Sequence, residues 1–375
     1  MQFIDLKRQY RKYSKEIDES ILKVVRSGQF ILGDEVAALE NKLSEFVGTK
    51  YAVGVASGTD ALMLSLMASD IPKGSIVITT PFSFFATVEV ILLLGLKPFF
   101  VDIDFETFNI DVDLLKKAVF DLKKNGQDVR AIMPVSLYGL CSDMDAINDI
   151  AKENHLLVIE DACQSFGATY KNKRSCNLSD VGVTSFFPSK PLGCYGDGGM
   201  IFTNNKEIYE NVKMLRIHGS KKRYEHEKVG LNSRLDTIQA SVLLTKFSFF
   251  ENEIELRQKV AAKYIELLRS LKEHIAFQKI PKDCKSVYAQ FTIRIISKDR
   301  DEVSSYLNSN GIPTAIHYPK PLPFQSALNG FGFKKGMFPN AEKAANEVLS
   351  LPMHPYLTEE EQINVATILK RYFVN

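Results

Sequence analysis

The stretch Tyr51-Ala-Val-Gly-Val-Ala-Ser-Gly-Thr-Asp-Ala-Leu62 joins a short apolar run to the start of a helical pattern. The apolar half is typical of a buried strand, and a turn containing Gly58 separates it from the helix. Backbone N–H groups without partners collect at a helix start, so Gly58 and Thr59 could bind an anion there. A simple helix cap is the competing interpretation, because Ser and Thr are common at helix starts.

The same strand–helix alternation continues outward to about residue 205. Strands are predicted at Tyr51–Ala56, Ser75–Thr79, Pro98–Val101, Ala131–Val135 and Leu156–Glu160. Helices are predicted between them at Asp60–Ala68, Thr87–Leu94, Asp113–Leu122 and Met144–Glu153. This order predicts an α/β fold with a mostly parallel sheet flanked by helices. Ligands bind such sheets beyond the carboxyl ends of the strands, so residues just after a strand are the first candidates for a site.

The chain has 375 residues, so a large domain and a smaller one are expected. A helix is predicted to start near Ser233, which with Asp236 resembles a capping box. A long helix through about residues 247–270 would connect the domains, followed by a strand at Tyr288–Ile295 and a helix at Asp301–Asn308. The expected division is residues 1–30 as an N-terminal segment whose helix (about Arg11–Arg26) packs on the small domain, residues 31–250 as the large domain, and residues 251–375 as a smaller C-terminal α+β domain.

Charge and composition argue against several classes of partner. The formal net charge is +2 with basic and acidic residues mixed, so nothing favours nucleic acid. The apolar run Val90–Leu94 is too short for a membrane span, and the N-terminus lacks a signal-peptide pattern, so a cytoplasmic protein is expected. The dispersed histidines show no metal-ligand spacing, so no metal site is expected. Five scattered cysteines indicate reduced thiols: Cys141, Cys163, Cys176, Cys194 and Cys284.

Lys190 lies in Thr184-Ser-Phe-Phe-Pro-Ser-Lys-Pro-Leu-Gly-Cys-Tyr-Gly-Asp-Gly-Gly, where an apolar strand runs into tight, irregular backbone. A lysine held near the sheet end can have its amine pKa lowered by burial or by a neighbouring cation, which makes it nucleophilic toward an aldehyde. A solvated loop lysine is the commoner case for a Lys-Pro taken alone.

Three further side chains follow predicted strands. Asp161 ends the run Leu156-Leu-Val-Ile-Glu-Asp, where a carboxylate would face the ligand crevice and could pair with a pyridinium nitrogen; a turn aspartate is the alternative. Gln164, one helical turn later, could donate to a phenolate oxygen of the same ring. Phe84, in Pro81-Phe-Ser-Phe-Phe-Ala-Thr, could stack on a planar cofactor, although a phenylalanine there is more often part of the core. A dinucleotide or nucleotide site has no anchor, because no Gly-x-Gly-x-x-Gly lies between a strand and a helix and no Walker A sequence is present.

Taken together, these motifs resemble the DegT/DnrJ/EryC1/StrS family of sugar-nucleotide aminotransferases, a branch of the fold-type I pyridoxal 5′-phosphate (PLP) enzymes. The resemblance covers essentially the whole chain. It rests on Ser57-Gly-Thr-Asp-Ala-Leu, Val101-Asp-Ile-Asp, Pro134-Val-Ser-Leu-Tyr-Gly, Ile159-Glu-Asp-Ala-Cys-Gln-Ser-Phe-Gly-Ala, Ser185-Phe-Phe-Pro-Ser-Lys, Arg216-Ile-His-Gly and Asn232-Ser-Arg-Leu-Asp.

The resemblance implies a role for each candidate residue. Lys190 is expected to form the covalent bond to PLP and to shuttle the proton, and Asp161 to pair with the pyridine nitrogen. The other cofactor contacts implied are Gln164 at the phenolic oxygen, Phe84 stacked on the ring, and Gly58, Thr59 and Ser185 at the phosphate. Asn232 is expected to reach the phosphate of the neighbouring subunit's cofactor, in a homodimer with two shared sites whose subunits exchange the loop His218–Gly230. Candidate substrate contacts are Arg234, His317 and Tyr318.

The resemblance also implies a ping-pong transamination with L-glutamate as amino donor. Gln164 is similar to members that aminate carbon 3 of the sugar. Four stretches resemble enzymes acting on UDP-2-acetamido-2-deoxy-3-oxo-D-glucuronate for bacterial surface polysaccharides: Lys173-Arg-Ser-Cys-Asn-Leu-Ser, Pro188-Ser-Lys-Pro-Leu-Gly-Cys-Tyr-Gly-Asp-Gly, Ser286-Val-Tyr-Ala-Gln and Leu351-Pro-Met-His-Pro-Tyr. The neutral UDP-3-oxo-N-acetylglucosamine of lipid A synthesis and a dTDP-3-oxo-6-deoxyhexose are the rival substrates.

Two functions of other classes stay open on the same fold. A dehydratase of the family would carry His in place of the cofactor-binding lysine, so Lys190 argues against it. A non-catalytic regulatory or binding protein is the second alternative, and intact Lys190, Asp161 and Ser185 argue against that role as well.

Overall fold

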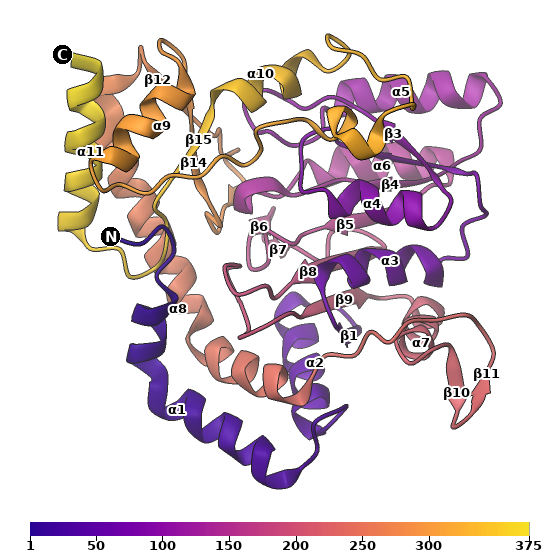
Figure 1. Ribbon diagram of the computed structural model, residues 1–375. Helices are drawn as coiled ribbons and strands as arrows, with labels where there is room; N and C mark the ends of the chain where they lie inside the picture. Colours follow the sequence, from indigo (N-terminus) through magenta and orange to yellow (C-terminus); the bar gives the residue numbers. More distant parts are fainter. Residues whose placement is uncertain (375) are drawn as a thin grey trace.

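The computed structural model describes residues 1–374 and contains a seven-stranded sheet as its largest element (Figure 1). All neighbouring strands of this sheet run parallel except β9, which is antiparallel to both of its neighbours. The predicted α/β fold with a mostly parallel sheet is therefore confirmed. In spatial order the strands are β1 (Tyr51–Val55), β9 (Gly199–Thr203), β8 (Val181–Ser185), β5 (Leu157–Asp161), β4 (Val129–Met133), β2 (Ile76–Thr79) and β3 (Lys97–Phe100).

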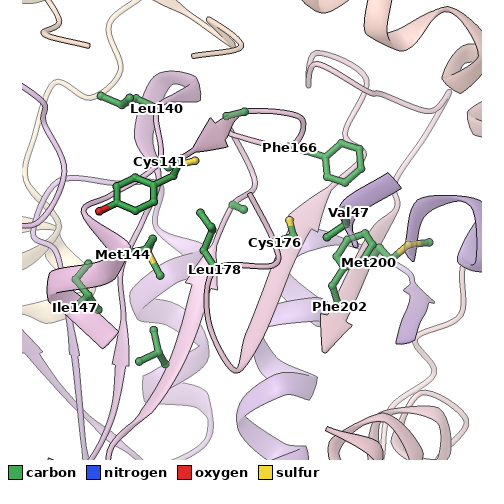
Figure 2. Packing of buried hydrophobic residues seen from close by; sticks show 14 of the residues in the cluster. Val47, Leu140, Cys141, Met144, Ile147, Phe166, Cys176, Leu178, Met200 and Phe202 are labelled. Atoms are coloured by element: carbon green, nitrogen blue, oxygen red, sulfur yellow. The ribbon is translucent and has the colours of Figure 1, made fainter. Parts of the chain in front are cut away.

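Helices cover both faces of this sheet. One face packs against α3 (Gly58–Ala68), α4 (Ala86–Leu93) and α7 (Lys206–Leu215). The other face packs against α2 (Asp34–Val47), α5 (Val112–Lys124), α6 (Met144–Asn154) and the first half of α8 (Thr237–Leu268). Successive strand residues point to opposite faces, so Ala52 belongs to one core and Val53 to the other. In the core between the sheet and α2, Phe166 stacks on Phe202 with ring centroids 5.9 Å apart. Figure 2 shows both side chains among the buried residues of this core.

The predicted strands and helices of residues 50–160 all form, with ends displaced by at most two residues. The predicted cap at Ser233 is wrong. Helix α8 begins at Thr237, and Asp236 is its N-cap residue. Ser233 is instead buried four residues earlier, where its hydroxyl accepts a hydrogen bond from the backbone N–H of Ala56 at 3.4 Å.

The C-terminal part builds a second, smaller core around a three-stranded antiparallel sheet. Its strands are β12 (Ile275–Phe277), β14 (Phe291–Ile295) and β15 (Val348–Leu351), and its helices are α9 (Arg300–Ser309), α10 (Pro339–Glu347) and α11 (Glu359–Val374). The two helical patterns expected near residues 233 and 247–270 are one continuous helix, α8, which leads from the large sheet into this core (Figure 1). The proposed domain boundary at residue 250 therefore falls inside a helix, and the division of the chain into domains stays a prediction.

The N-terminal helix α1 (Leu6–Ser27) lies along α8 (Figure 1). Tyr13 stacks on Phe249 with ring centroids 3.7 Å apart, and the N-terminal end of α1 is tied to α11 by an ion pair from Arg8 to Glu361 at 2.9 Å. Helix α1 therefore contacts the first half of α8, and it also contacts α11 in the C-terminal part of the chain.

Short elements complete the fold. A hairpin of β10 (Ser220–Lys222) and β11 (Glu225–His226) projects from the end of α7, within the loop expected to cross between subunits (Figure 1). A small sheet pairs β13 (Cys284–Lys285) with β6 (Thr169–Tyr170) and β7 (Lys173–Arg174). Single 3-10 turns occur at Leu137–Gly139, Arg269–Leu271, Leu322–Phe324 and Ser326–Leu328. Within residues 1–374, no helix combines the length and apolar character that a membrane crossing requires.

Candidate active site

A cavity of about 490 Å³ opens at the carboxyl edge of the large sheet. Most of the segments that line it end or follow β1, β2, β4, β5 and β8, or precede the antiparallel strand β9, and the C-terminal part adds Gln290, His317 and Tyr318. Parallel strands bring their carboxyl ends to one edge, which explains why residues more than 100 positions apart meet here. The lining residues are Ser57, Gly58, Thr59, Leu62, Ser83, Phe84, Ala86, Thr87, Val135, Asp161, Cys163, Gln164, Ser185, Phe187, Ser189, Lys190, Asp197, Gln290, His317 and Tyr318.

Lys190 reaches the cavity from a compact loop after β8. The backbone N–H of Lys190 donates to the carbonyl of Phe187 at 2.9 Å, and that of Cys194 donates to the carbonyl of Phe186 at 2.8 Å. These bonds fold the loop back on itself. The buried amine of Lys246 on α8 donates to the carbonyl of Gly193 at 2.7 Å. This hydrogen bond holds the loop against α8. The lysine is therefore held at the sheet edge, as the sequence predicts.

Asp161 is the last residue of β5 and is buried in the wall of the cavity. Its Oδ2 accepts a hydrogen bond from the hydroxyl of Thr87 at 2.9 Å, and its Oδ1 accepts one from the backbone N–H of Cys163 at 3.2 Å. Burial, followed by the charge of Asp161, raises the pKa of the Cys163 thiol well above its ordinary value. That thiol is therefore protonated at neutral pH and is no nucleophile.

The start of α3 forms a cradle for an anion beside Ser185. The side chain of Ser57 caps the helix by accepting from the backbone N–H of Asp60 at 3.0 Å, while Gly58 and Thr59 occupy the first helical positions, where N–H groups have no partner within the helix. A Cβ on Gly58 would lie only 2.7 Å from the Cβ of Ser185, so only glycine lets these segments approach so closely. The arrangement suits a phosphate group.

Aromatic and amide groups form the rest of the wall. Phe84 presents an open ring face, 59% exposed, and its centroid lies 6.4 Å from that of Tyr318. Gln164 accepts a hydrogen bond from the backbone N–H of Tyr138 at 2.8 Å and donates one to the Tyr318 hydroxyl at 3.1 Å. Burial, followed by the charge of Lys190, lowers the pKa of His317 to about 4, so its ring is neutral at physiological pH.

Two predicted site residues lie outside this cavity. Asn232 is exposed and Arg234 is half-buried, in the segment that leads into α8. All the other predicted site residues line the cavity, although their individual roles stay predictions. Sequence reasoning missed Thr87 and Gln290. Thr87 lies in the first turn of α4, well after the end of β2 at Thr79, so its position in the sequence predicted only a helix start.

The chemistry of these groups fits PLP. The cradle at the start of α3 matches its phosphate, the Asp161 carboxylate its ring nitrogen, the exposed face of Phe84 its ring, and the Lys190 amine its aldehyde carbon. Within residues 1–374, no group of three or more His, Cys, Asp or Glu side chains could hold a metal ion. Fold and site together define the class of PLP-dependent enzymes.

Comparison with known proteins identifies the family of PLP-dependent enzymes to which the chain belongs. The model of the "DegT/DnrJ/EryC1/StrS aminotransferase family" matches residues 11–370, and the chain belongs to that family. It is 51% identical to UDP-2-acetamido-2-deoxy-3-oxo-D-glucuronate aminotransferase of Pseudomonas aeruginosa over 95% of this chain and 96% of the relative. It is also 43% identical to a protein of Geobacillus stearothermophilus called pleiotropic regulatory protein, over 99% of this chain and 98% of that relative.

A solved structure supports the same assignment. The crystal structure of NtdA from Bacillus subtilis, with its bound cofactor PMP (pyridoxamine phosphate), superposes with a TM-score of 0.91 at 30% sequence identity. The match covers all of this chain and 85% of the other. The resemblance inferred from the motifs is therefore confirmed at the level of the family and of the fold.

Proposed function

We propose that this protein transfers the amino group of L-glutamate to carbon 3 of UDP-2-acetamido-2-deoxy-3-oxo-D-glucuronate, in the synthesis of a bacterial surface polysaccharide. The observation that carries this proposal is the convergence of Lys190, Asp161 and the anion cradle in one cavity, in a chain that shares half its residues with an aminotransferase named for that sugar. The cytoplasm is the proposed location, in keeping with five cysteines that form no disulfide among the described residues.

PLP, when bound, supplies an electron sink that stabilises negative charge on the carbon that loses its proton. The chain supplies the proton transfers. Lys190 Nζ takes a proton from the α-carbon of glutamate in the first half-reaction and delivers one to carbon 3 of the sugar in the second. Thr87 and the backbone of Cys163 hold the Asp161 carboxylate in a fixed orientation. The neutral ring of His317 can contact substrate without adding positive charge beside Lys190.

A homodimer with shared sites accounts for the two residues outside the cavity. Asn232 and Arg234 lie on a segment that does not face the cavity of their own chain, so they are available to complete the site of a second copy. Lys190 is the one cation among the described lining residues, and it is engaged in the chemistry. A uronate carboxylate would therefore need a cation from elsewhere, and Arg234 of a second copy is the proposed source.

A regulatory protein on the same fold is the second candidate function. It is favoured by one observation, the name pleiotropic regulatory protein carried by a relative at 43% identity. A protein with that role alone has no need of a lysine and a carboxylate held at the sheet edge, whereas both are in place here.

The visible absorption spectrum of the protein with PLP, recorded before and after addition of L-glutamate, separates these two functions. The transaminase predicts a band from lysine-bound cofactor that disappears with glutamate, and no such response in Lys190→Ala. A spectrum that glutamate leaves unchanged in the intact protein would contradict the assignment of donor and lysine and would favour the regulatory role.

A further inference from the structure

Two side chains of α8 hold the loop that carries Lys190. The amine of Lys246 donates to the carbonyl of Gly193 at 2.7 Å, three residues past Lys190. The side-chain oxygen of Gln239 accepts a hydrogen bond from the backbone N–H of Tyr195 at 2.8 Å. Seven residues span about two turns of a helix, so Gln239 and Lys246 lie on one face of α8. That face therefore contacts the loop at two neighbouring points.

Lys246 is a buried cation that has no carboxylate partner among residues 1–374. It is 3% exposed, and its ammonium lies 4.4 Å from the centre of the Tyr195 ring, whose face attracts a cation. The carboxylate of Glu253, further along α8, hydrogen-bonds Gln9 and Tyr356 instead. Burial lowers the pKa of Lys246 to about 8, so most of the amine is protonated at pH 7. Burying an unpaired charge costs free energy, so packing alone does not explain a lysine at this position.

The backbone around Gly193 is packed too tightly to move by itself. A Cβ on Gly193 would lie 2.5 Å from the carbonyl oxygen of Pro188 and 2.8 Å from that of Phe187. The same Phe187 carbonyl accepts a hydrogen bond from the backbone N–H of Lys190 at 2.9 Å. A displacement of Gly193 is therefore passed on to the backbone that carries Lys190. A shift of about 1 Å in a catalytic group can lower a rate about 100-fold, because proton transfer needs donor and acceptor within hydrogen-bond reach.

We propose that Lys246 is a positioning residue for Lys190: its ammonium holds the Gly193 carbonyl against α8 and so fixes the place of the Lys190 amine in the cavity. Lys246 itself does not line the cavity, so it acts through the loop. The kinetic consequences rest on the proposed function, because they assume that Lys190 transfers the proton in both half-reactions. The contact between the loop and α8 does not depend on that assumption.

Lys246→Met tests the contact, because methionine keeps an unbranched apolar side chain and removes the charged donor. Amide hydrogen exchange of residues 186–195 is measured by mass spectrometry on protein without cofactor. We expect exchange in this segment to be faster by about tenfold or more, because the hydrogen bonds that close the loop open more often once Gly193 is released. Exchange that is unchanged from wild type would overturn the inference.

Lys259→Met is the matched control, since Lys259 is an exposed lysine of the same helix. It should leave exchange and rates unchanged, and equal effects of the two substitutions would overturn the inference. Tyr195→Leu removes the ring beside the Lys246 ammonium and keeps the inference testable if Lys246→Met does not fold. It should change exchange and rates in the same direction by about two- to fivefold, and no change in either would contradict the role of the cation.

Single-turnover kinetics of the protein with PLP separate positioning from a merely structural role. At saturating glutamate we expect the rate constant of Lys246→Met to fall about 10- to 100-fold, while the dissociation constant of glutamate stays near its wild-type value. The half-reaction with the keto-sugar should lose the same factor, because Lys190 transfers a proton in both. A merely structural loss would reduce the amount of protein that reacts but not its rate constant. An unchanged rate constant, or a loss in only one half-reaction, would overturn the inference.

The two measurements also separate failure of this inference from failure of the proposed function. Wild-type protein that responds to neither glutamate nor any keto-sugar contradicts the proposed function, and hydrogen exchange in cofactor-free protein still decides whether Lys246 holds the loop. Wild-type activity together with unchanged exchange in Lys246→Met contradicts the inference alone.

Discussion

At the scale of single residues, the site depends on how the Asp161 carboxylate is held. Its two oxygens receive hydrogen bonds from groups of different kinds, a side-chain hydroxyl at 2.9 Å and a backbone N–H at 3.2 Å. The backbone donor persists in any variant of residue 163 except proline, but the hydroxyl depends on Thr87 alone. Thr87 is therefore a positioning residue whose contribution can be removed without touching the cofactor contacts.

Thr87→Val replaces the hydroxyl by a methyl group of similar size and leaves Oδ2 of Asp161 without this donor. We expect kcat/KM to fall about tenfold, because a hydrogen bond to a charged group contributes roughly 1.5–3 kcal/mol and part of it is recovered by water. The pH at which the visible band of bound cofactor changes should shift as well, which a purely structural role would not cause. Thr87→Ser should restore both quantities, and failure of Ser to do so would contradict the orienting role.

The sequence predicted those site residues that end a strand or follow it within about five residues, because the physical rule for α/β sheets locates them without any knowledge of packing. Lys190, Asp161, Gly58 and Ser185 are of this kind. Gln290 is different, because it enters the cavity from the second core, and only the contacts of its segment with Gly139 reveal where its side chain lies. The sequence linked the stretch Ser286–Gln290 to the substrate only through a resemblance, and no residue pattern there predicts where the Gln290 side chain lies.

At the scale of elements, the turn at Gly139 couples the large sheet to the segment that carries Gln290. Gly139 has a φ of +102°, and a Cβ at this position would lie 2.7 Å from the backbone N of Tyr288 and 2.8 Å from that of Ala289. Gly126 also has a positive φ, +68°, but a Cβ there would have no neighbour within 4 Å. Both glycines therefore have a positive φ, but only at Gly139 would a side chain collide with a neighbouring segment.

Gly139→Ala should lower the free energy of unfolding by about 3 kcal/mol or more, since positive φ costs an alanine roughly 1–2 kcal/mol and overpacking adds roughly 1–3 kcal/mol. Gly126→Ala should cost only about 1–2 kcal/mol, from backbone strain alone. Urea unfolding of both variants measures the difference. Equal losses would show that the contact with residues 288 and 289 contributes nothing to stability.

The spacing of the apolar residues predicted whether a segment is a helix or a strand. The residue at which a helix or strand begins or ends depends instead on tertiary contacts. Ser233 shows the reason: its sequence pattern favours a cap, but its hydroxyl bonds Ala56 at the end of β1, and α8 starts four residues later at Thr237. Strand β9 was not among the predicted strands. Residues 186–198, which connect β8 to β9, form no helix and fold back on themselves in the loop that carries Lys190, so β9 returns antiparallel to β8.

At the scale of the whole molecule, the buried His354 and the half-buried His317 make the fold sensitive to acid. His354 is 2% exposed, and neither of its ring nitrogens has a partner among residues 1–374. Burial, followed by the charges of Arg257 and Arg8, lowers its pKa to about 4, and burial lowers that of His317 to about 4 as well. Between pH 6.5 and 4 these two side chains bind protons in the unfolded chain but not in the folded chain, so their contribution lowers stability as the pH falls through this range.

One such histidine lowers the free energy of unfolding by about 3 kcal/mol when the pH falls from 7 to 4. His354→Asn removes one titrating group, so its unfolding midpoint should depend less steeply on pH than that of the wild type. His155→Asn is the control, because His155 is exposed in a left-handed conformation that asparagine tolerates. Urea midpoints between pH 7 and 4.5 measure the slopes, and identical slopes for His354→Asn and wild type would contradict this origin of the acid sensitivity.

The most direct test of the central claim is to offer keto-sugars to protein that glutamate has already converted to its amino form. We predict that UDP-2-acetamido-2-deoxy-3-oxo-D-glucuronate restores the original absorption band, that the product gains an amino group at carbon 3, and that neither UDP-3-oxo-N-acetylglucosamine nor a dTDP-3-oxo-6-deoxyhexose does so at a comparable rate. Faster return of the band with a neutral sugar would contradict the choice of a uronate. No return with any of the three would contradict transfer to a 3-keto sugar nucleotide.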